Sequence, residues 1–168
     1  AFADYISQMR KARENSRFLP AVKIPAQIEL SHNLKSALFQ QDLVVLAIPS
    51  QYMRGVLKKI KSLDYPRQAI YLSVTKGIEI SSLKTMSEII HEELGPVKSA
   101  VLSGPTIAHE VVMGIPTTAV VASTNQKISK LLQDIFTTES FRIYTNKDVM
   151  GVELGASLKN IIAIPCGI

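Results

Sequence analysis

Short apolar runs alternate with amphipathic segments along most of this chain, and this alternation constrains the fold more than any other feature. The expected strands cover residues 42–49, 69–74, 99–103, 117–123 and 141–145, and the first two have the apolar composition of buried parallel strands. Helical patterns separate most of them, at 51–60, 82–94 and 125–136. Strands that alternate with helices predict an α/β fold, with a mostly parallel sheet covered by helices on both faces.

The remaining segments complete this plan. We expect a polar helix over 4–16, an extended loop over 18–30 because of its two prolines, and a short helix over 33–39. Ser50 is expected to cap the helix that follows it, and Pro105 to occupy the first turn of another. A long helix is expected to begin near residue 148, and residues 146–148 are the predicted domain boundary.

Three loops follow strands of the predicted sheet and carry small or charged residues. They are "PSQ" at 49–51, "TKG" at 75–77 and "SGPT" at 103–106. Ligands of such sheets bind at the carboxyl ends of the strands, so these loops are candidate binding segments. Lys76 suits a phosphate or carbonyl oxygen, and Gly104 and Thr106 suit an anion at a helix start. The alternatives are an exposed loop lysine and ordinary turn and capping chemistry.

The stretch "GVELGASLKN" at 151–160 has a helical pattern but places Gly151, Gly155 and Lys159 four residues apart. Each glycine inside a helix costs about 1 kcal/mol relative to alanine, so another interaction is expected to offset that cost. One explanation is a ligand beside Lys159, with Asn160 holding a substrate oxygen or orienting the lysine. The other is close helix packing through Gly151, Gly155 and Ala156, with Lys159 reaching solvent.

Composition restricts the function classes. The formal net charge is +5, but the basic residues are scattered and aromatic residues make up only 6%, so we expect no nucleic-acid partner. No apolar run approaches the roughly 18 residues of a membrane span. The single cysteine, Cys166, cannot form an internal disulfide, which favours a cytoplasmic location. There is no metal-ligand spacing and no G-x-G-x-x-G fingerprint.

Four motifs in order resemble one enzyme family. They are "FLPAVKIP", "VTKGIE", "LSGPTIAHEVVMGIPTTAVVAS" and "FRIYTNKDVMGVELGASLKNIIAIPCGI", and the match runs from about Asn15 onward. Together they resemble the bacterial, soluble, NAD(P)-dependent glycerol-3-phosphate dehydrogenases. The resemblance implies a Rossmann-like NAD(P)-binding domain over 1–147 and the first helix of an all-α substrate domain over 148–168.

The resemblance also implies an activity and a set of site residues. The activity is reversible hydride transfer between NAD(P)H and dihydroxyacetone phosphate, which supplies sn-glycerol 3-phosphate for phospholipid synthesis. By matching position, Lys159 resembles the catalytic proton acceptor, which acts as a donor when the ketone is reduced. Lys76 resembles a contact to both cofactor and substrate. The other expected substrate contacts are Gly104, Thr106 and Asn160, and the other expected cofactor contacts are Pro49, Ser50 and Ala108.

The chain also departs from the family pattern. The family's first strand, its glycine-rich fingerprint, the helix after it and its second strand have no counterpart here. The family's later region, which supplies an Arg-Asn pair and an Asp for the substrate, also has no counterpart in this sequence. We therefore expect this polypeptide to be an internal part of such an enzyme and not to turn over alone. By the same resemblance we expect a homodimer.

Two other function classes stay open at this stage. One is a related enzyme, such as a 6-phosphogluconate or 3-hydroxyacid dehydrogenase, which also places a lysine and an asparagine on a long helix. The motifs "SGPTIAHE" and "TKGIE" argue against it. The other is a non-catalytic nucleotide-binding or scaffold module, since fold does not imply function. The presence of Lys76, Lys159 and Asn160 disfavours that class.

Overall fold

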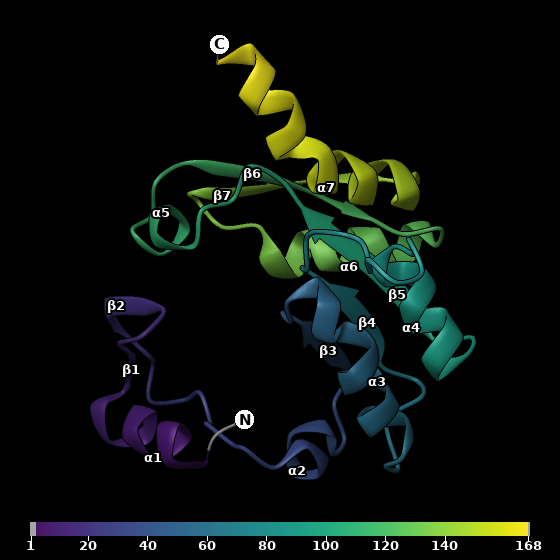
Figure 1. Ribbon diagram of the computed structural model, residues 1–168. Helices are drawn as coiled ribbons and strands as arrows, with labels where there is room; N and C mark the ends of the chain where they lie inside the picture. Colours follow the sequence, from purple (N-terminus) through teal and green to yellow (C-terminus); the bar gives the residue numbers. More distant parts are fainter. Residues whose placement is uncertain (1–2, 168) are drawn as a thin grey trace.

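A five-stranded sheet organises the fold in the computed structural model, which describes residues 3–167 apart from the side chain of Asn160 (Figure 1). The strands lie in sequence order: β3 (Leu43–Leu46), β4 (Ile70–Ser73), β5 (Lys98–Ser103), β6 (Thr117–Ala122) and β7 (Phe141–Asn146). Neighbouring strands are parallel except β5 and β6. The prediction of an α/β fold with a mostly parallel sheet is therefore confirmed.

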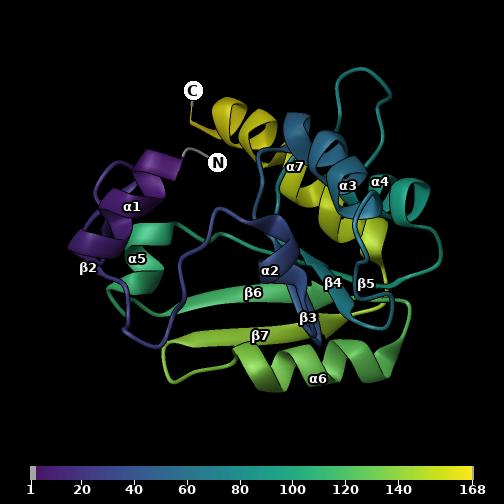
Figure 2. The same cartoon turned by 90° about the horizontal axis from the view of Figure 1, so that it is seen from below.

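Helices cover both faces of this sheet. Figure 2 shows α6 (Gln126–Phe136) along one face, with α3 (Met53–Lys61), α4 (Met86–Leu94) and α7 (Val149–Cys166) on the other. The shorter helices are α1 (Ala3–Ala12), α2 (Leu34–Leu38), α5 (Ala108–Val112) and the 3₁₀ turn η1 (Ser50–Tyr52). The result is the layered arrangement that strand–helix alternation predicts.

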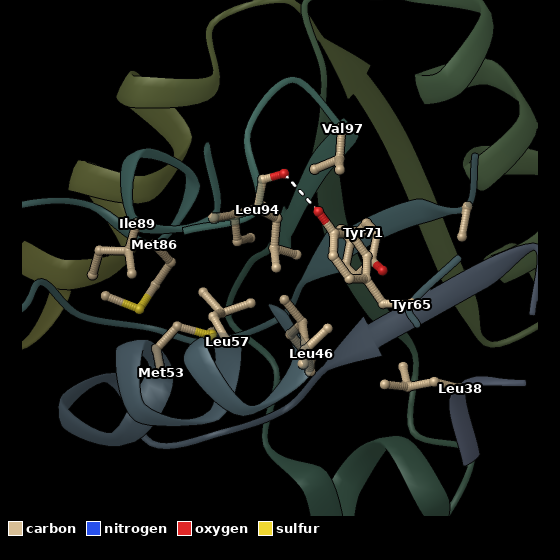
Figure 3. Packing of buried hydrophobic residues seen from close by; sticks show 13 residues of the cluster. Leu38, Leu46, Met53, Leu57, Tyr65, Tyr71, Met86, Ile89, Leu94 and Val97 are labelled. Carbon is tan, nitrogen blue, oxygen red and sulfur yellow. Dashed lines mark hydrogen bonds between the residues drawn. The ribbon is translucent and has the colours of Figure 1, made fainter. Parts of the chain in front are cut away.

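Each face of the sheet has its own apolar core. On the first face, α3 and α4 pack over β3 and β4, with Leu57, Tyr71 and Ile89 fully buried (Figure 3). The Tyr65 hydroxyl in this cluster donates to the Leu94 carbonyl at 3.0 Å, so its polar end is satisfied. On the second face, α6 packs over β6 and β7, and the apolar cluster there extends to β4 and β5. Two such cores hold the sheet rigid under the loops at its carboxyl end.

The antiparallel pair β5–β6 has a local cause. Residues 104–116 join the two strands and contain only the five-residue helix α5. A parallel partner needs a crossover that packs along the sheet, usually through a longer helix. This connection instead turns back at the same edge, so Ser103 lies opposite Val120. The start of β6 therefore shares an edge with the carboxyl ends of β3, β4 and β5.

The segment 18–30 is not the simple extended loop that its prolines predicted. Residues Leu19–Lys23 form β2, which pairs antiparallel with β1 (Glu14–Asn15). A two-stranded ribbon has free edges, where a proline such as Pro20 costs no ladder hydrogen bond. This ribbon and α1 lie to one side of the sheet, where β2 contacts α5 (Figure 2).

Other local predictions were wrong or only partly right, among them the polar helix expected over 4–16, which ends at Ala12. β3 is only partly buried: it is the edge strand of the described sheet, in which Leu46 is buried and Val45 is exposed. The helix expected from 82 begins at Met86, because Thr85 and Glu88 form a capping box there. The Ser50 side chain caps no helix, since η1 begins at Ser50 without a side-chain cap bond.

Candidate functional site

A cavity of about 320 Å³ opens at the carboxyl ends of β4 and β5, beneath α7. Its walls come from the loops after these strands, from β6 and from one face of α7. The lining residues are Lys76, Ser103, Gly104, Pro105, Val120, Gly151, Val152, Gly155, Ala156 and Lys159. Two lysines far apart in sequence thus share one pocket with apolar walls, at the edge where the sheet topology predicted a ligand.

Lys76 is held in place by oxygen atoms of the loop after β5. Its Nζ donates to the Gly104 carbonyl at 3.0 Å and to the Thr106 hydroxyl at 3.2 Å. A longer bond of 3.4 Å reaches the Thr106 carbonyl. Partial burial, followed by the charge of Lys159, lowers the pKa of Lys76 below its usual value. The ammonium therefore stands at a fixed place on the cavity wall.

Lys159 enters the same cavity from α7, and the glycines before it have different roles. Gly155 has no atom within 4 Å of the place where a side chain would begin, so no other segment of the described structure packs closely against it. Gly151 instead makes room for the helix cap: Asp148 Oδ1 accepts from Gly151 N at 2.8 Å, and an added Cβ would lie 2.7 Å from Asp148 Cγ. Open space beside Lys159 is what a ligand requires.

Two polar anchors fix α7 against the rest of the domain. The buried Glu153 carboxylate accepts from Ser87 N at 2.8 Å and from Ser87 Oγ at 2.6 Å, in the first turn of α4. The Ser157 hydroxyl accepts from Gly77 N at 3.1 Å, next to Lys76. A carboxylate at a helix N-terminus is favoured by the unpaired N–H groups and by the helix dipole. These contacts set the position of Lys159 relative to Lys76.

Gly104 and Thr106 were expected at a helix start, but they do not lie at one, because α5 begins only at Ala108. Thr106 N instead donates to the Gly104 carbonyl at 2.8 Å, which makes a tight turn. Gly104 is required for close approach: an added Cβ would lie 2.7 Å from the Thr118 carbonyl oxygen and 2.8 Å from Ala119 Cα. The turn therefore serves to bind Lys76 and to bring β5 against β6.

Of the residues expected at the cofactor, Lys76 lines the cavity, whereas Pro49, Ser50 and Ala108 do not. Ser50 lies against Gly77, whose φ of +115° suits glycine and whose added Cβ would lie 2.9 Å from Ser50 Oγ. Pro49 precedes Ser50 and is exposed. Ala108, the first residue of α5, is also exposed. Asn160 lies on α7, but its side chain falls outside the described part of the structure.

Side chains that sequence reasoning missed hold the loops after β3 and β4. Thr75 Oγ1 donates to the Ile48 carbonyl at 2.7 Å and accepts from Ile48 N at 3.2 Å. Arg54 on α3 binds the buried Glu79 at 2.8 Å, Glu93 at 2.7 Å and Glu92 at 3.1 Å. The guanidinium, together with the Ser82 hydroxyl, lowers the pKa of Glu79 to about 2. An acidic residue directly after "TKGI" was the available signal.

Ser103 and Glu153 were also missed. Both are buried polar side chains within motifs that the sequence analysis quoted.

Within residues 3–167, no group of three or more His, Cys, Asp and Glu side chains converges as a metal site requires. No helix of that range has the length and apolarity to cross a membrane.

Comparisons with known proteins agree on one family. The family model described as "NAD-dependent glycerol-3-phosphate dehydrogenase N-terminus" matches residues 2–129. A glycerol-3-phosphate dehydrogenase [NAD(P)+] of Fusobacterium nucleatum is 45% identical over 163 residues, which are 96% of this chain and 48% of that protein. One of Pelotomaculum thermopropionicum is 45% identical over 172 residues, which are 100% of this chain and 49% of that protein.

A solved structure agrees with these sequence relatives. The crystal structure of glycerol-3-phosphate dehydrogenase from Coxiella burnetii superimposes with a TM-score of 0.89 and 34% identity, over 96% of this chain and 49% of that one. The chain thus spans about half the length of the curated relatives it matches.

Proposed function

The chain belongs to the NAD-dependent glycerol-3-phosphate dehydrogenase family, and from this we propose that it forms one side of that enzyme's active site. The proposed reaction is reversible hydride transfer between NAD(P)H and dihydroxyacetone phosphate, which gives sn-glycerol 3-phosphate. The proposed substrate-facing residues are Lys76, Gly104, Thr106, Lys159 and Asn160.

One observation carries this proposal: Lys76 and Lys159 line a single cavity from opposite segments of the chain. Two cationic groups at one pocket attract an anionic substrate such as a phosphate ester. The volume of about 320 Å³ suits a small molecule. A non-catalytic scaffold module gives no reason for two lysines beside the open space at Gly155.

The lysines have different proposed roles. Lys76 is held by three oxygen contacts, so it is a fixed positive charge that orients the substrate. Lys159 is the proposed proton donor in ketone reduction. When hydride reaches the ketone carbon, negative charge develops on its oxygen, and an ammonium at that oxygen stabilises the charge and then gives up a proton. In the reverse direction the same amine accepts the proton.

The residues present fit a nicotinamide cofactor, which supplies the hydride when it is bound. The apolar walls at Val120, Val152 and Ala156 suit a flat ring, and Gly155 leaves room beside them. Pro49, Ser50, Lys76 and Ala108 are the residues that we propose hold the cofactor. Ser50 and Lys76 belong to loops that touch at Gly77, so one ligand can reach both.

The wider setting is proposed on the same basis. Residues 1–147 are assigned to the NAD(P)-binding domain and 148–168 to the first helix of an α-helical substrate domain. The apolar side chains of Ile161, Ile162 and Ile164 are exposed on that helix, which supports a helical neighbour there. We further propose that the enzyme is a cytoplasmic homodimer that supplies glycerol 3-phosphate for phospholipid synthesis.

The direct test follows the absorbance of the reduced cofactor with the full-length gene product, which falls in ketone reduction and rises in alcohol oxidation. Dihydroxyacetone phosphate is offered as the substrate with NADH and with NADPH, and 6-phosphogluconate and a 3-hydroxyacid are tested in the oxidative direction. The proposal predicts turnover with dihydroxyacetone phosphate and rates at least about a hundredfold lower with the other two. A protein that is inert with dihydroxyacetone phosphate and both cofactors contradicts it.

A further inference from the structure

Ser103 is a buried hydroxyl that the protein itself leaves without a partner. It is the last residue of β5 and only 8% exposed. Its Oγ has no hydrogen-bond partner among the described residues, and it is the only buried side-chain nitrogen or oxygen of which this holds there. Folding removes such a hydroxyl from water, so leaving it unpaired opposes stability. A buried group of this kind calls for an explanation.

The other buried serines show how such hydroxyls are ordinarily satisfied. Ser123 Oγ donates to the Ser99 carbonyl at 2.9 Å, and Ser129 Oγ donates to the Gln126 carbonyl at 3.1 Å. Ser73 Oγ accepts from Thr75 N at 3.4 Å. Ser103 therefore differs from its own class within the described structure. What distinguishes it is its place, because of these four serines it alone lines the cavity with the two lysines.

The surroundings of Ser103 select the kind of ligand atom that it can bind. Val120 lies directly opposite it on β6, and Val152 and Ala156 are further apolar walls. A phosphate oxygen carries charge, and placing it in an apolar recess is costly without a cation beside it. A neutral hydroxyl costs much less to bury, and a hydrogen bond to Ser103 offsets that cost. Because a serine hydroxyl both donates and accepts, it can pair with another hydroxyl in either orientation.

This step rests on the proposed function, which supplies a substrate with three kinds of oxygen. The phosphate requires cations beside it, and the reacting ketone or alcohol oxygen is the proposed partner of the Lys159 amine. The remaining group is the primary hydroxyl at the end opposite the phosphate, which the ketone and the alcohol have in common. We propose that Ser103 Oγ binds this primary hydroxyl, and that Ser103 is a specificity-determining residue of the enzyme.

The test compares Ser103→Ala with the unchanged full-length protein, using two ligands. The first is dihydroxyacetone phosphate, for which KM and kcat are measured. The second is acetol phosphate, which has hydrogen in place of the primary hydroxyl and is used as a competitor. The variant is expected to lose about tenfold in kcat/KM for dihydroxyacetone phosphate. The inhibition constant of acetol phosphate should change by less than about twofold.

Thermal stability provides a second readout, and Ser123→Ala is the matched control. Ser103→Ala removes an unpaired hydroxyl, so its melting temperature is expected to stay the same or rise. Ser123→Ala removes a satisfied hydroxyl away from the cavity, so its melting temperature should fall while kcat/KM stays unchanged. A merely structural role for Ser103 predicts a lower melting temperature and an equal loss with both ligands.

The outcomes separate this inference from the proposed function. If the unchanged protein is inert with dihydroxyacetone phosphate, the proposed function fails, and the assignment of Ser103 fails with it. If the unchanged protein is active and Ser103→Ala matches it with both ligands, only the assignment of Ser103 is wrong. An equal loss of affinity for both ligands also refutes that assignment, because the primary hydroxyl is then not the partner.

Discussion

Glu153 offers the sharpest link between the fold and the site, because one buried carboxylate holds α7 against α4. Its two acceptor bonds to Ser87 are 2.8 and 2.6 Å long. In Glu153→Ala, Ser87 N loses its partner inside the domain, whereas Ser87 Oγ keeps a contact of 3.2 Å to Thr85 Oγ1. Hydrogen bonds to a charged group contribute about 1.5–3 kcal/mol each. With one bond lost outright and one partly replaced, we expect the free energy of unfolding to fall by about 3 kcal/mol.

Glu153→Gln separates the charge from the hydrogen bonds. The amide oxygen can still accept from Ser87 N, and the amide nitrogen can donate to Ser87 Oγ. Only the attraction between the charge and the N-terminus of α4 is lost, so the expected cost is about 0.5–1 kcal/mol. Because Lys159 lies on the same helix, Glu153→Ala should also lower kcat by about tenfold or more, and Glu153→Gln should lower it far less.

Urea denaturation gives the stability change, and the reduced-cofactor assay gives kcat. Asp134→Ala is the matched control, because Asp134 also loses a carboxylate but forms only an exposed pair with Lys130, with side chains 62% and 64% exposed. Its removal should cost less than about 0.5 kcal/mol. If Glu153→Ala is as stable and as active as Asp134→Ala, the carboxylate does not anchor α7 and this reasoning is refuted.

Two other predictions concern the loops around the cavity. Gly104→Ala should lower stability by about 1–3 kcal/mol, because its Cβ meets backbone atoms of β6 that have no room to move. Gly55→Ala in α3 meets open space and should be neutral or stabilising in the same thermal melt; equal losses in both variants would contradict this. Arg54 holds the folded pKa of Glu79 near 2, below the 4.5 of the unfolded chain. The stabilisation by Glu79 is therefore complete above pH 4.5 and is lost as the pH falls toward 2. Glu79→Gln should thus be less stable than the unchanged protein at pH 7. Between pH 4.5 and pH 2 it should lose less stability than the unchanged protein does. Glu139→Gln, at an exposed carboxylate, is the control, and parallel acid profiles for the two variants would refute the role of Arg54.

Much of the fold was predictable because strand and helix periodicities are local. The runs at β4, β5, β6 and β7 stand out by length and apolar content, and Asn125 and Asp148 begin their helices as capping residues do. The order of the strands was not predicted, because it depends on contacts between distant segments. Pro105 illustrates competing rules: proline suits a first helical turn, but here the tight turn from Gly104 to Thr106 delays α5.

The candidate site was predictable in part for a similar reason. Lys76 follows a strand, and Lys159 follows two glycines at helical spacing, so both attract attention in the sequence alone. Ser103 and Glu153 do not, because their importance lies in burial and in hydrogen bonds made or missing in three dimensions. The sequence predicted that Lys76 contacts a ligand, whereas its hydrogen bonds to Gly104 and Thr106 can be seen only in the structure.

The central claim, that Lys159 performs the proton transfer, is tested most directly by Lys159→Met in the full-length gene product. The side chain keeps similar length and apolar volume but loses the proton. We predict that kcat with dihydroxyacetone phosphate falls by about 10²–10⁴-fold. The Kd of the reduced cofactor, measured by its fluorescence, should change by less than about threefold, since Lys159 is not one of the proposed cofactor contacts. A variant that keeps kcat within about threefold of the unchanged enzyme contradicts the account.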